Sequence, residues 1–283
     1  MSPIGATPFR FEMRIPLWVE KLFHLTSNAL FAVWPQPIPD MEKLLDCRIV
    51  SHRGEHDNAS VFENTIEAFD TAHAGGVWGV EFDIRWTRDL HPVVSHDRDL
   101  QRIFGSARVI GRMTRAELRK TFPLIPFLEE VIDRYGRHMH LMVEIKEEDY
   151  PDPEFQSRRL SQIFSGLTPE MDYHFLSLAP AMFRHLDFVP ASSFIAVSQL
   201  NVTTMSRQAL ERHYQGLAGH YLFMTRHVIR LHKQNRQQIG TGYIHSRNSL
   251  FRELNRDVDW IFSNHAVHLQ QVLQKAINAA PAR

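Results

Sequence analysis

The sequence lacks several features that would assign it to particular classes of protein. Cys47 is the single cysteine in 283 residues, so no disulfide can form within the chain. The 32 lysines and arginines balance 32 aspartates and glutamates, whereas nucleic-acid-binding proteins usually carry a clear basic excess. These absences exclude a disulfide scaffold, argue against a nucleic-acid partner and favour a reducing compartment, the cytoplasm.

Long hydrophobic runs are missing too, including at the aromatic-rich N-terminus. No basic segment precedes an unbroken apolar core with a small-residue cleavage site, so no secretory signal is indicated. Glu20, Lys21 and His24 interrupt the best apolar window. Three prolines between residues 35 and 39 then end this window short of the ~20 residues that a membrane span needs.

Residues 1–46 are expected to form a helical extension to one domain over residues 47–283. Apolar residues that could share one helical face in the extension are Leu17, Phe23, Leu30, Phe31 and Trp34. One interpretation is that this helix packs across the closed end of the domain. The alternative is a shallow contact with a partner or with the inner face of a membrane. The sequence indicates no oligomeric state.

From residue 47 onward, short apolar runs alternate with helical patterns. Eight runs predict strands, at Arg48–Ser51, Val77–Ile84, Leu141–Ile145, Tyr173–Leu178, Phe194–Gln199, His220–Met224, Ile239–Ile244 and Val258–Ser263. Helices are expected at residues 64–74, from Thr114, and at 127–135, 154–164, 179–186, 203–214, 226–237, 246–255 and 266–279. Such repeated units predict an α/β fold, a closed (β/α)8 TIM barrel; an open doubly wound sheet is the alternative.

A ninth run, Pro92–His96, lies outside this count. About seven residues separate it from Ile84, and they include Arg88 and Asp89, which favour a turn. A parallel crossover needs a dozen or more residues. We therefore expect this run to return antiparallel, as a hairpin arm after the second strand.

Polar side chains lie at the ends of the first three predicted strands. They are His52 and Arg53, Glu81 and Asp83, and Glu144 and Lys146. Residues i and i+2 of a strand point the same way, and active-site residues of a barrel project from the C-terminal ends of its strands. Carboxylates that share a barrel mouth repel each other unless a cation lies between them. Such hard oxygen ligands suit Mg²⁺ or Ca²⁺.

Each polar fragment alone is usually a solvated edge or a surface loop, but chance does not readily put five in order at successive strand ends. Together they resemble the glycerophosphodiester phosphodiesterase family, within the phosphatidylinositol-phospholipase-like (β/α)8 superfamily. The matching fragments are His52-Arg53-Gly54, Glu63-Asn64-Thr65, Glu81-Phe82-Asp83, Pro92-Val93-Val94-Ser95-His96-Asp97 and Glu144-Ile145-Lys146. Weaker matches include Leu100-Gln101-Arg102 and the segment 258–264. The resemblance spans residues 47–275 and leaves 1–46 outside.

The resemblance implies metal-dependent hydrolysis of glycerophosphodiesters to sn-glycerol 3-phosphate and an alcohol. Glu81, Asp83 and Glu144 would bind one divalent cation, Mg²⁺ or Ca²⁺. The implied acid–base pair is His52 and His96. In the same comparison Arg53 grips the phosphate, Lys146 adds positive charge, and Glu63 orients Arg53 or His52.

Elementary chemistry agrees with these implied roles. Cleaving a phosphodiester requires neutralising the anionic phosphate, which a metal, Arg53 and Lys146 can do. A nucleophile must lose a proton and the leaving alkoxide must gain one, which two histidines can provide. Either histidine can take either role, and either water or a substrate hydroxyl can attack first.

Two departures from the family pattern concern the substrate. Gly242-Tyr243-Ile244-His245 stands where the family usually has Trp-Thr-Val-Asn, so Tyr243 is a candidate to replace the tryptophan that lines the substrate pocket. The modest length between His96 and Glu144 leaves no room for a large cap, so we expect an open mouth. An open mouth beside an aromatic extension raises the alternative of a lysophospholipase D. A barrel that binds phosphorylated ligands without turnover is the second alternative.

Overall fold

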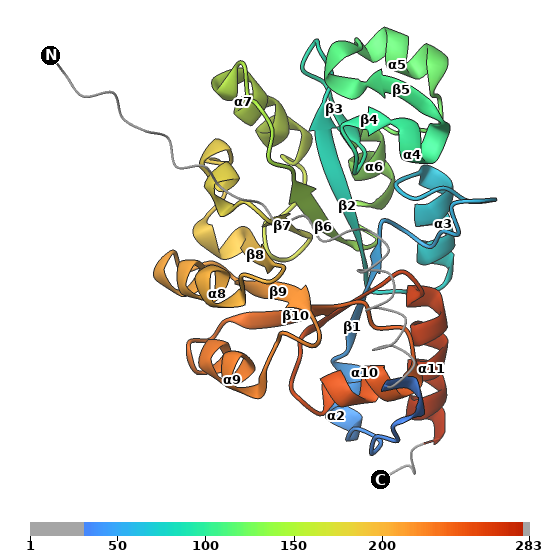
Figure 1. Ribbon diagram of the computed structural model, residues 1–283, viewed down its shortest axis with the longest axis vertical. Helices are drawn as coiled ribbons and strands as arrows, with labels where there is room; N and C mark the ends of the chain where they lie inside the picture. Colours follow the sequence, from blue (N-terminus) through green and yellow to red (C-terminus); the bar gives the residue numbers. More distant parts are fainter. Residues whose placement is uncertain (1–30, 280–283) are drawn as a thin grey trace, which may run out of the picture.

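Eight parallel strands close into a barrel within residues 31–279, the part of the chain that this computed structural model describes (Figure 1). The strands are β1 (Arg48–His52), β2 (Gly79–Trp86), β6 (His140–Ile145), β7 (Tyr173–Ser177), β8 (Phe194–Ser198), β9 (Gly216–His220), β10 (Gln238–Gly242) and β11 (Trp260–Ser263). Parallel pairing of β1 with both β11 and β2 closes the ring. The predicted (β/α)8 barrel is confirmed.

Helices cover the outside of the barrel. They are α3 (Ile66–Ala74), α6 (Leu128–Tyr135), α7 (Pro153–Ile163), α8 (Val202–Glu211), α9 (Arg226–Gln234), α10 (Arg247–Leu254) and α11 (Ala266–Ala279). Side-chain caps begin several of them: the Thr65 hydroxyl accepts from the Ala68 amide before α3. Such caps satisfy backbone N–H groups that the first helical turn leaves without a partner.

Two predicted elements were wrong. The sixth strand is Gly216–His220, and it ends where the prediction His220–Met224 began. Its sequence, Gly-Leu-Ala-Gly-His, has low strand propensity, but pairing with β8 and β10 on both sides supplies the missing stabilisation. The predicted helix at 179–186 is a 3₁₀ segment, η2 (Pro180–His185), which is longer than most 3₁₀ runs.

Alternation along the strands divides the barrel interior into an apolar floor and a polar mouth. The buried floor consists of Val50, Met142, Leu176, Ile195, Ala218, Trp260 and Phe262. Two residues beyond Val50 on β1 comes His52, whose register partner on β2 is Glu81. Asp83 lies opposite Glu144 on β6. The fold therefore places the ionisable side chains together at the C-terminal ends of β1, β2 and β6.

A small lobe interrupts the barrel between β2 and β6. It starts with β3 (Pro92–Val94), which pairs antiparallel with β2. The other elements are β4 (Asp99–Leu100), α4 (Gln101–Phe104), β5 (Ser106–Val109), η1 (Ile110–Arg112) and α5 (Arg115–Thr121). In Figure 1 the lobe stands at the top, and its core is separate from that of the barrel. The β4–β5 pair and α4 were not foreseen from the sequence.

The described end of the N-terminal extension runs along α10. Nδ2 of Asn248 donates to the Ala32 carbonyl (2.7 Å), and Nδ2 of Asn255 donates to that of Pro37 (2.9 Å). The Phe31 ring meets Tyr221, directly after β9, at a centroid distance of 5.5 Å. Phe31 therefore lies toward the mouth, and the chain descends to α2 (Met41–Leu45) before entering β1.

The remaining predictions for the extension fall on other residues. Leu17, Phe23 and Leu30, the rest of the expected helical face, lie outside the described residues. The division into 1–46 and 47–283 stays a prediction. Among residues 31–279, no helix combines the length and apolar character needed to cross a bilayer.

Candidate active site

The turn after β1 contains two consecutive residues with positive φ. Arg53 has φ 60° and Gly54 has φ 79°, both in the left-handed region. A Cβ on Gly54 would lie 2.7 Å from the Cβ of Ala68, so glycine is required by both conformation and space. The Arg53 amide donates to the Glu81 carbonyl (2.8 Å). This turn brings His52 and Arg53 to the ends of β2 and β6.

Three carboxylates converge in the mouth. Oxygens of Glu81, Asp83 and Glu144 lie within 4.8 Å of one another, the only such acidic, histidine or cysteine group in the described part of the chain. Burial, together with the charges of Asp83 and Glu144, raises the pKa of Glu81 well above its usual value. Oε1 of Glu81 is buried and has no hydrogen-bond partner among the described residues.

One ammonium group partly compensates these charges. Nζ of Lys146 lies 2.6 Å from Oδ1 of Asp83 and also pairs with Glu144. Burial opposes ionisation of Asp83, but Lys146 and Arg53 hold the pKa of this carboxyl below its ordinary range. Three buried carboxylates facing one lysine, with a partnerless oxygen among them, fit a hard divalent cation that takes oxygen ligands.

Arg53 reaches over this cluster from the β1 turn. Its NH1 donates to Oε1 of Glu63 (2.9 Å), and its Nε lies 3.5 Å from Oδ2 of Asp83. Nδ2 of Asn64 donates to the same Asp83 oxygen (2.9 Å). Arg53 is therefore held between two acidic residues, and its guanidinium faces the carboxylate cluster.

Glu63 is buried and accepts from several donors. Besides Arg53, it accepts from Nδ2 of Asn58 (2.9 Å) and from both terminal nitrogens of Arg102 (2.8 and 2.6 Å). Burial would raise the pKa of Glu63, but these hydrogen bonds and the charges of Arg102 and Arg53 keep it below its ordinary value. Glu63 is thus an ionised anchor for two arginines.

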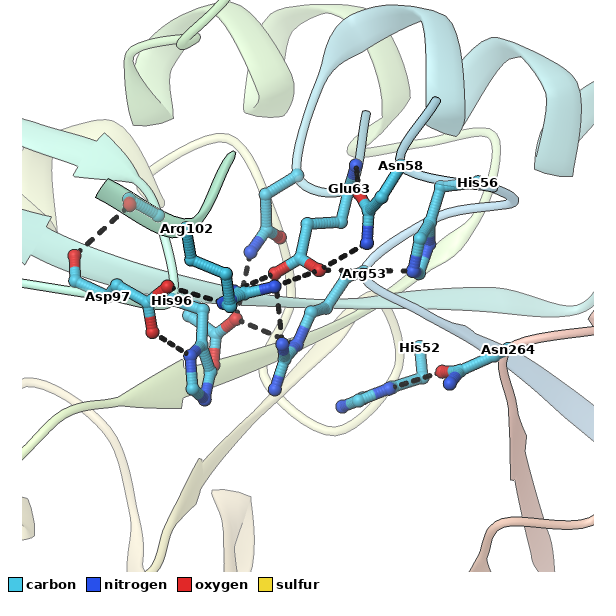
Figure 2. Close-up of polar contacts among 12 residues, drawn as sticks. His52, Arg53, His56, Asn58, Glu63, His96, Asp97, Arg102 and Asn264 are labelled. Carbon is cyan, nitrogen blue, oxygen red and sulfur yellow. Dashed lines mark hydrogen bonds and ion pairs between the residues drawn. The ribbon is translucent and has the colours of Figure 1, made fainter. Parts of the chain in front are cut away.

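Two imidazoles lie at the site, each fixed at Nδ1. Nδ1 of His52 lies 2.6 Å from Oδ1 of Asn264, which follows β11, and Nδ1 of His96 lies 2.7 Å from Oδ1 of Asp97. Because an amide oxygen and a carboxylate accept hydrogen bonds, both Nδ1 atoms carry a proton. Each neutral ring then presents Nε2 as its free acceptor. Figure 2 shows Arg53 between the two rings in that view.

The surroundings of the two imidazoles differ. Burial, followed by the charge of Arg53, lowers the pKa of His52 to about 3. Burial also lowers the pKa of His96, although the charge of Asp83 and the bond to Asp97 oppose it. Nε2 of His52 lies 3.7 Å from Oε2 of Glu81, which places this ring against the carboxylate cluster.

The structure gathers most residues that the sequence singled out. Those brought together at the mouth are His52, Arg53, Glu63, Glu81, Asp83, His96, Glu144 and Lys146. Tyr243 lies elsewhere on the rim, after β10. Tyr243 is 43% exposed, and the centroid of its ring lies 5.0 Å from that of His220.

Four polar residues of the site received no such role from the sequence. Asn64 and Thr65 were both candidates to cap α3; Thr65 is the cap, and Asn64 binds Asp83. Asp97 and Arg102 stood inside recognised fragments without an assigned contact, and Asn264 stood in a weaker one. Their polarity within these fragments was the available signal; their partners depend on contacts between distant segments.

Comparison with known proteins gives one consistent group. Residues 52–167 match the Glycerophosphoryl diester phosphodiesterase family. The chain is 44% identical over 72 residues to a probable glycerophosphodiester phosphodiesterase 1 of Mycobacterium tuberculosis, covering 25% of this chain and 26% of the relative. It is 30% identical over 125 residues to the Bacillus subtilis glycerophosphodiester phosphodiesterase, covering 37% and 42%. In these matches the chain spans only about a quarter to two fifths of the relatives' own lengths.

Other similarities extend further along the chain. A Bacillus altitudinis glycerophosphodiester phosphodiesterase is 24% identical over 77% of this chain and 94% of its own length. The solved Thermotoga maritima glycerophosphodiester phosphodiesterase matches the fold with a TM-score of 0.67 at 22% identity, covering 80% of this chain and 98% of that one. An Oleispira antarctica phosphodiesterase gives the same TM-score and identity, covering 82% and 97%. The fragments, the barrel and the matches agree with one another, and all of them resemble the glycerophosphodiester phosphodiesterase family, whose model matches residues 52–167.

Proposed function

We propose that this protein hydrolyses glycerophosphodiesters to sn-glycerol 3-phosphate and an alcohol, with one divalent cation, Mg²⁺ or Ca²⁺. The observation that carries the proposal is the mouth itself. It combines three converging carboxylates, an arginine, a lysine and two imidazoles with free Nε2 atoms. Together these groups meet the charge and proton requirements of phosphodiester cleavage.

The anionic phosphate is bound by positive groups. Glu81, Asp83 and Glu144 would hold the cation, which supplies Lewis-acid stabilisation of charge on the phosphate oxygens when bound. Arg53, whose planar guanidinium matches phosphate oxygens, grips the phosphate from the β1 side. Lys146 adds a second fixed positive charge within the cluster.

Proton transfer falls to His52 and His96. One neutral ring accepts at Nε2 the proton of the attacking water or substrate hydroxyl. The other ring acts in its doubly protonated form, keeps the proton on Nδ1 and donates the proton on Nε2 to the leaving alkoxide. Asn264 and Asp97 fix the tautomer of each ring through Nδ1, so the reacting nitrogen faces the phosphate.

The names of the relatives support the substrate class. The Bacillus subtilis relative is named a glycerophosphodiester phosphodiesterase. The Oleispira antarctica phosphodiesterase was solved in complex with the product sn-glycerol-3-phosphate. A product of this kind carries the phosphate for which Arg53 and Lys146 are arranged here.

The test is release of sn-glycerol 3-phosphate from glycerophosphocholine by the purified protein. We expect release with Mg²⁺ or Ca²⁺, none with EDTA, and a loss of orders of magnitude in His96→Ala. His138→Ala, an exposed histidine beyond α6, serves as the matched control. Metal-independent release, or full activity of His96→Ala, would remove the proposed mechanism.

A lysophospholipase D activity is the second candidate, because apolar side chains line part of the rim. Leu178 after β7, Leu200 after β8 and Tyr243 after β10 are 37%, 68% and 43% exposed. Such a rim can receive an acyl chain. Relative turnover of lysophosphatidylcholine and glycerophosphocholine decides between the substrates. A lysolipid preference that Leu200→Ser reduces supports the second candidate, whereas preference for the short diester eliminates it.

A further inference from the structure

Arg102 joins the two halves of the site. It comes from α4 in the inserted lobe, not from a barrel strand. Its Nε donates to Oδ2 of Asp97 (2.7 Å), while NH1 and NH2 donate to the two oxygens of Glu63 (2.8 and 2.6 Å). One planar guanidinium therefore holds two carboxylates that originate from different loops.

Each of these carboxylates also binds one of the groups expected to act on the substrate. Oε1 of Glu63 accepts from NH1 of Arg53 (2.9 Å), and Oδ1 of Asp97 lies 2.7 Å from Nδ1 of His96. A continuous path of charged contacts thus runs from Arg53 through Glu63, Arg102 and Asp97 to His96, as Figure 2 shows. Arg102 therefore links Arg53, the proposed phosphate-binding side chain, to the imidazole of His96.

The bridge depends on the shape of the guanidinium. Three N–H directions from three nitrogens reach three oxygens on two residues, which an ammonium on a flexible stem cannot do at once. Arg102 also neutralises two like charges that would otherwise repel across the gap. Its own pKa is raised, first by the hydrogen bond to Glu63, so it stays charged.

The lobe does not need this guanidinium for its own packing. Its core consists of Val93, Leu100, Ile110, Met113, Leu118, Ile125 and Phe127. The ring of Phe104, near Arg102 on α4, packs between Phe62 and Phe122 at centroid distances of 5.8 and 5.6 Å. The Arg102 side chain is 45% exposed. It is therefore poorly placed to stabilise the lobe but well placed to bridge the two loops.

We propose that Arg102 is a positioning residue that sets His96 and Arg53 in register with each other, so that the inserted lobe completes the active site. This inference rests on the proposed phosphodiesterase function. It also gives the lobe a role in the site: Arg102 on α4 fixes the loop that carries Asp97 relative to the loop that carries Glu63.

The kinetic test compares Arg102→Ala with Arg108→Ala, which removes the same charge from an exposed arginine of β5 that bonds the Thr121 hydroxyl. We expect Arg102→Ala to lower kcat about 10–100-fold, the usual loss when a supporting partner of a site is removed, and to raise KM through Arg53. Arg108→Ala should stay within about twofold. Equal kinetics of the two variants would overturn the inference.

Chemical rescue separates positioning from general destabilisation. Because Arg102 is half exposed, guanidinium at millimolar concentration can enter the space left in Arg102→Ala and should restore part of kcat. Methylammonium should not, and Arg102→Lys should remain impaired, because neither has the planar fork. Equal rescue by both cations, or near-normal activity of Arg102→Lys, would refute the role of the fork.

A readout without turnover keeps this inference distinct from the proposed function. In ¹⁵N-histidine-labelled protein, the Nδ1 resonance of His96, assigned with His96→Ala, reports its bond to Asp97. It should shift in Arg102→Ala and not in Arg108→Ala. If the wild-type protein hydrolyses no phosphodiester, the proposed function fails, and this resonance still decides whether Arg102 positions His96: an unchanged resonance overturns the inference.

Discussion

Glu81→Gln should make the metal-free protein more stable while removing its response to metal. Oxygens of Glu81, Asp83 and Glu144 lie within 4.8 Å of one another, and Oε1 of Glu81 has no hydrogen-bond partner in the described residues. An amide at this position carries no charge and can donate to a neighbouring carboxylate. Where Glu81 is ionised, the substitution removes its repulsion from Asp83 and Glu144, the same charges that help to raise the pKa of its carboxyl. It also satisfies a buried group.

The magnitude follows from Coulomb's law. Two unit charges no more than 4.8 Å apart repel by at least about 3 kcal/mol at an effective dielectric constant of about 20. Glu81 faces two such charges, but Lys146 pairs with both Asp83 and Glu144 and offsets much of the repulsion. We expect a net gain of about 1–3 kcal/mol, equivalent to about 2–4 °C in Tm for each kcal/mol in a domain of this size.

The assay is thermal unfolding in EDTA and in excess Mg²⁺ or Ca²⁺. The wild-type protein should gain about 2.7 kcal/mol at a metal concentration 100 times its Kd, whereas Glu81→Gln should gain little. Glu147→Gln, an exposed residue just beyond the cluster, controls for loss of one negative charge. A Glu81→Gln protein no more stable than wild type in EDTA, or equally stabilised by metal, would refute the reasoning.

Three further predictions concern separate parts of the molecule. Arg53→Lys should lower kcat/KM by at least about tenfold, measured on glycerophosphocholine, because lysine cannot grip a phosphate with two parallel donors; unchanged kinetics would exclude the grip. Asp97→Asn should lower kcat with little change in KM, since it weakens the hold on His96 Nδ1 (2.7 Å) but leaves Arg53 with Glu63; a change in KM alone would contradict this. Burial lowers the pKa of His140 to about 4, below the value of about 6.5 that it has in the unfolded chain. The unfolded chain therefore binds more protons than the folded protein, and the folded protein loses stability as the pH falls below about 6.5. Urea unfolding at pH 7.5 and 5.0 should show a loss from this residue of about 2 kcal/mol that is absent in His140→Gln; an equal loss in both proteins would exclude His140 as the source.

The barrel could be predicted because its signals are local. Apolar runs, helical spacing and caps each depend on residues close in sequence. The helix expected from Thr114 is α5, which begins with a capping box of Thr114 and Glu117. The strand β9 was not predicted because its residues, Gly216–His220, are poor strand formers. Their conformation is fixed by the neighbours β8 and β10, which are separate in sequence.

The candidate site was foreseen as a set of residues but not as a network. Alternation along a strand was enough to group Glu81 with Asp83, because it is a property of one strand. The partners of His52 and Arg53 depend on residues that the fold brings in from elsewhere: Asn264 lies 212 positions from His52. A local sequence pattern carries no information on such contacts. Arg102 was therefore identified only as part of a matching fragment, and its contacts were not predicted.

Some residues at the barrel mouth adopt backbone conformations that their intrinsic propensities disfavour. Arg53, Asn64 and Tyr243 adopt φ values of 60°, 58° and 69°, a region that costs a non-glycine residue about 1 kcal/mol or more. All three lie on loops that follow or flank strand ends, and two of them bind Glu63 or Asp83. At Arg53 the cost is offset by hydrogen bonds: its amide donates to the Glu81 carbonyl, its carbonyl accepts from the Asn64 amide, and its NH1 donates to Oε1 of Glu63. Glu63 therefore has a structural effect beyond its charge: without it, the Arg53 guanidinium keeps only Asp83 of its two acidic partners, whereas His52 keeps its own partner, Asn264.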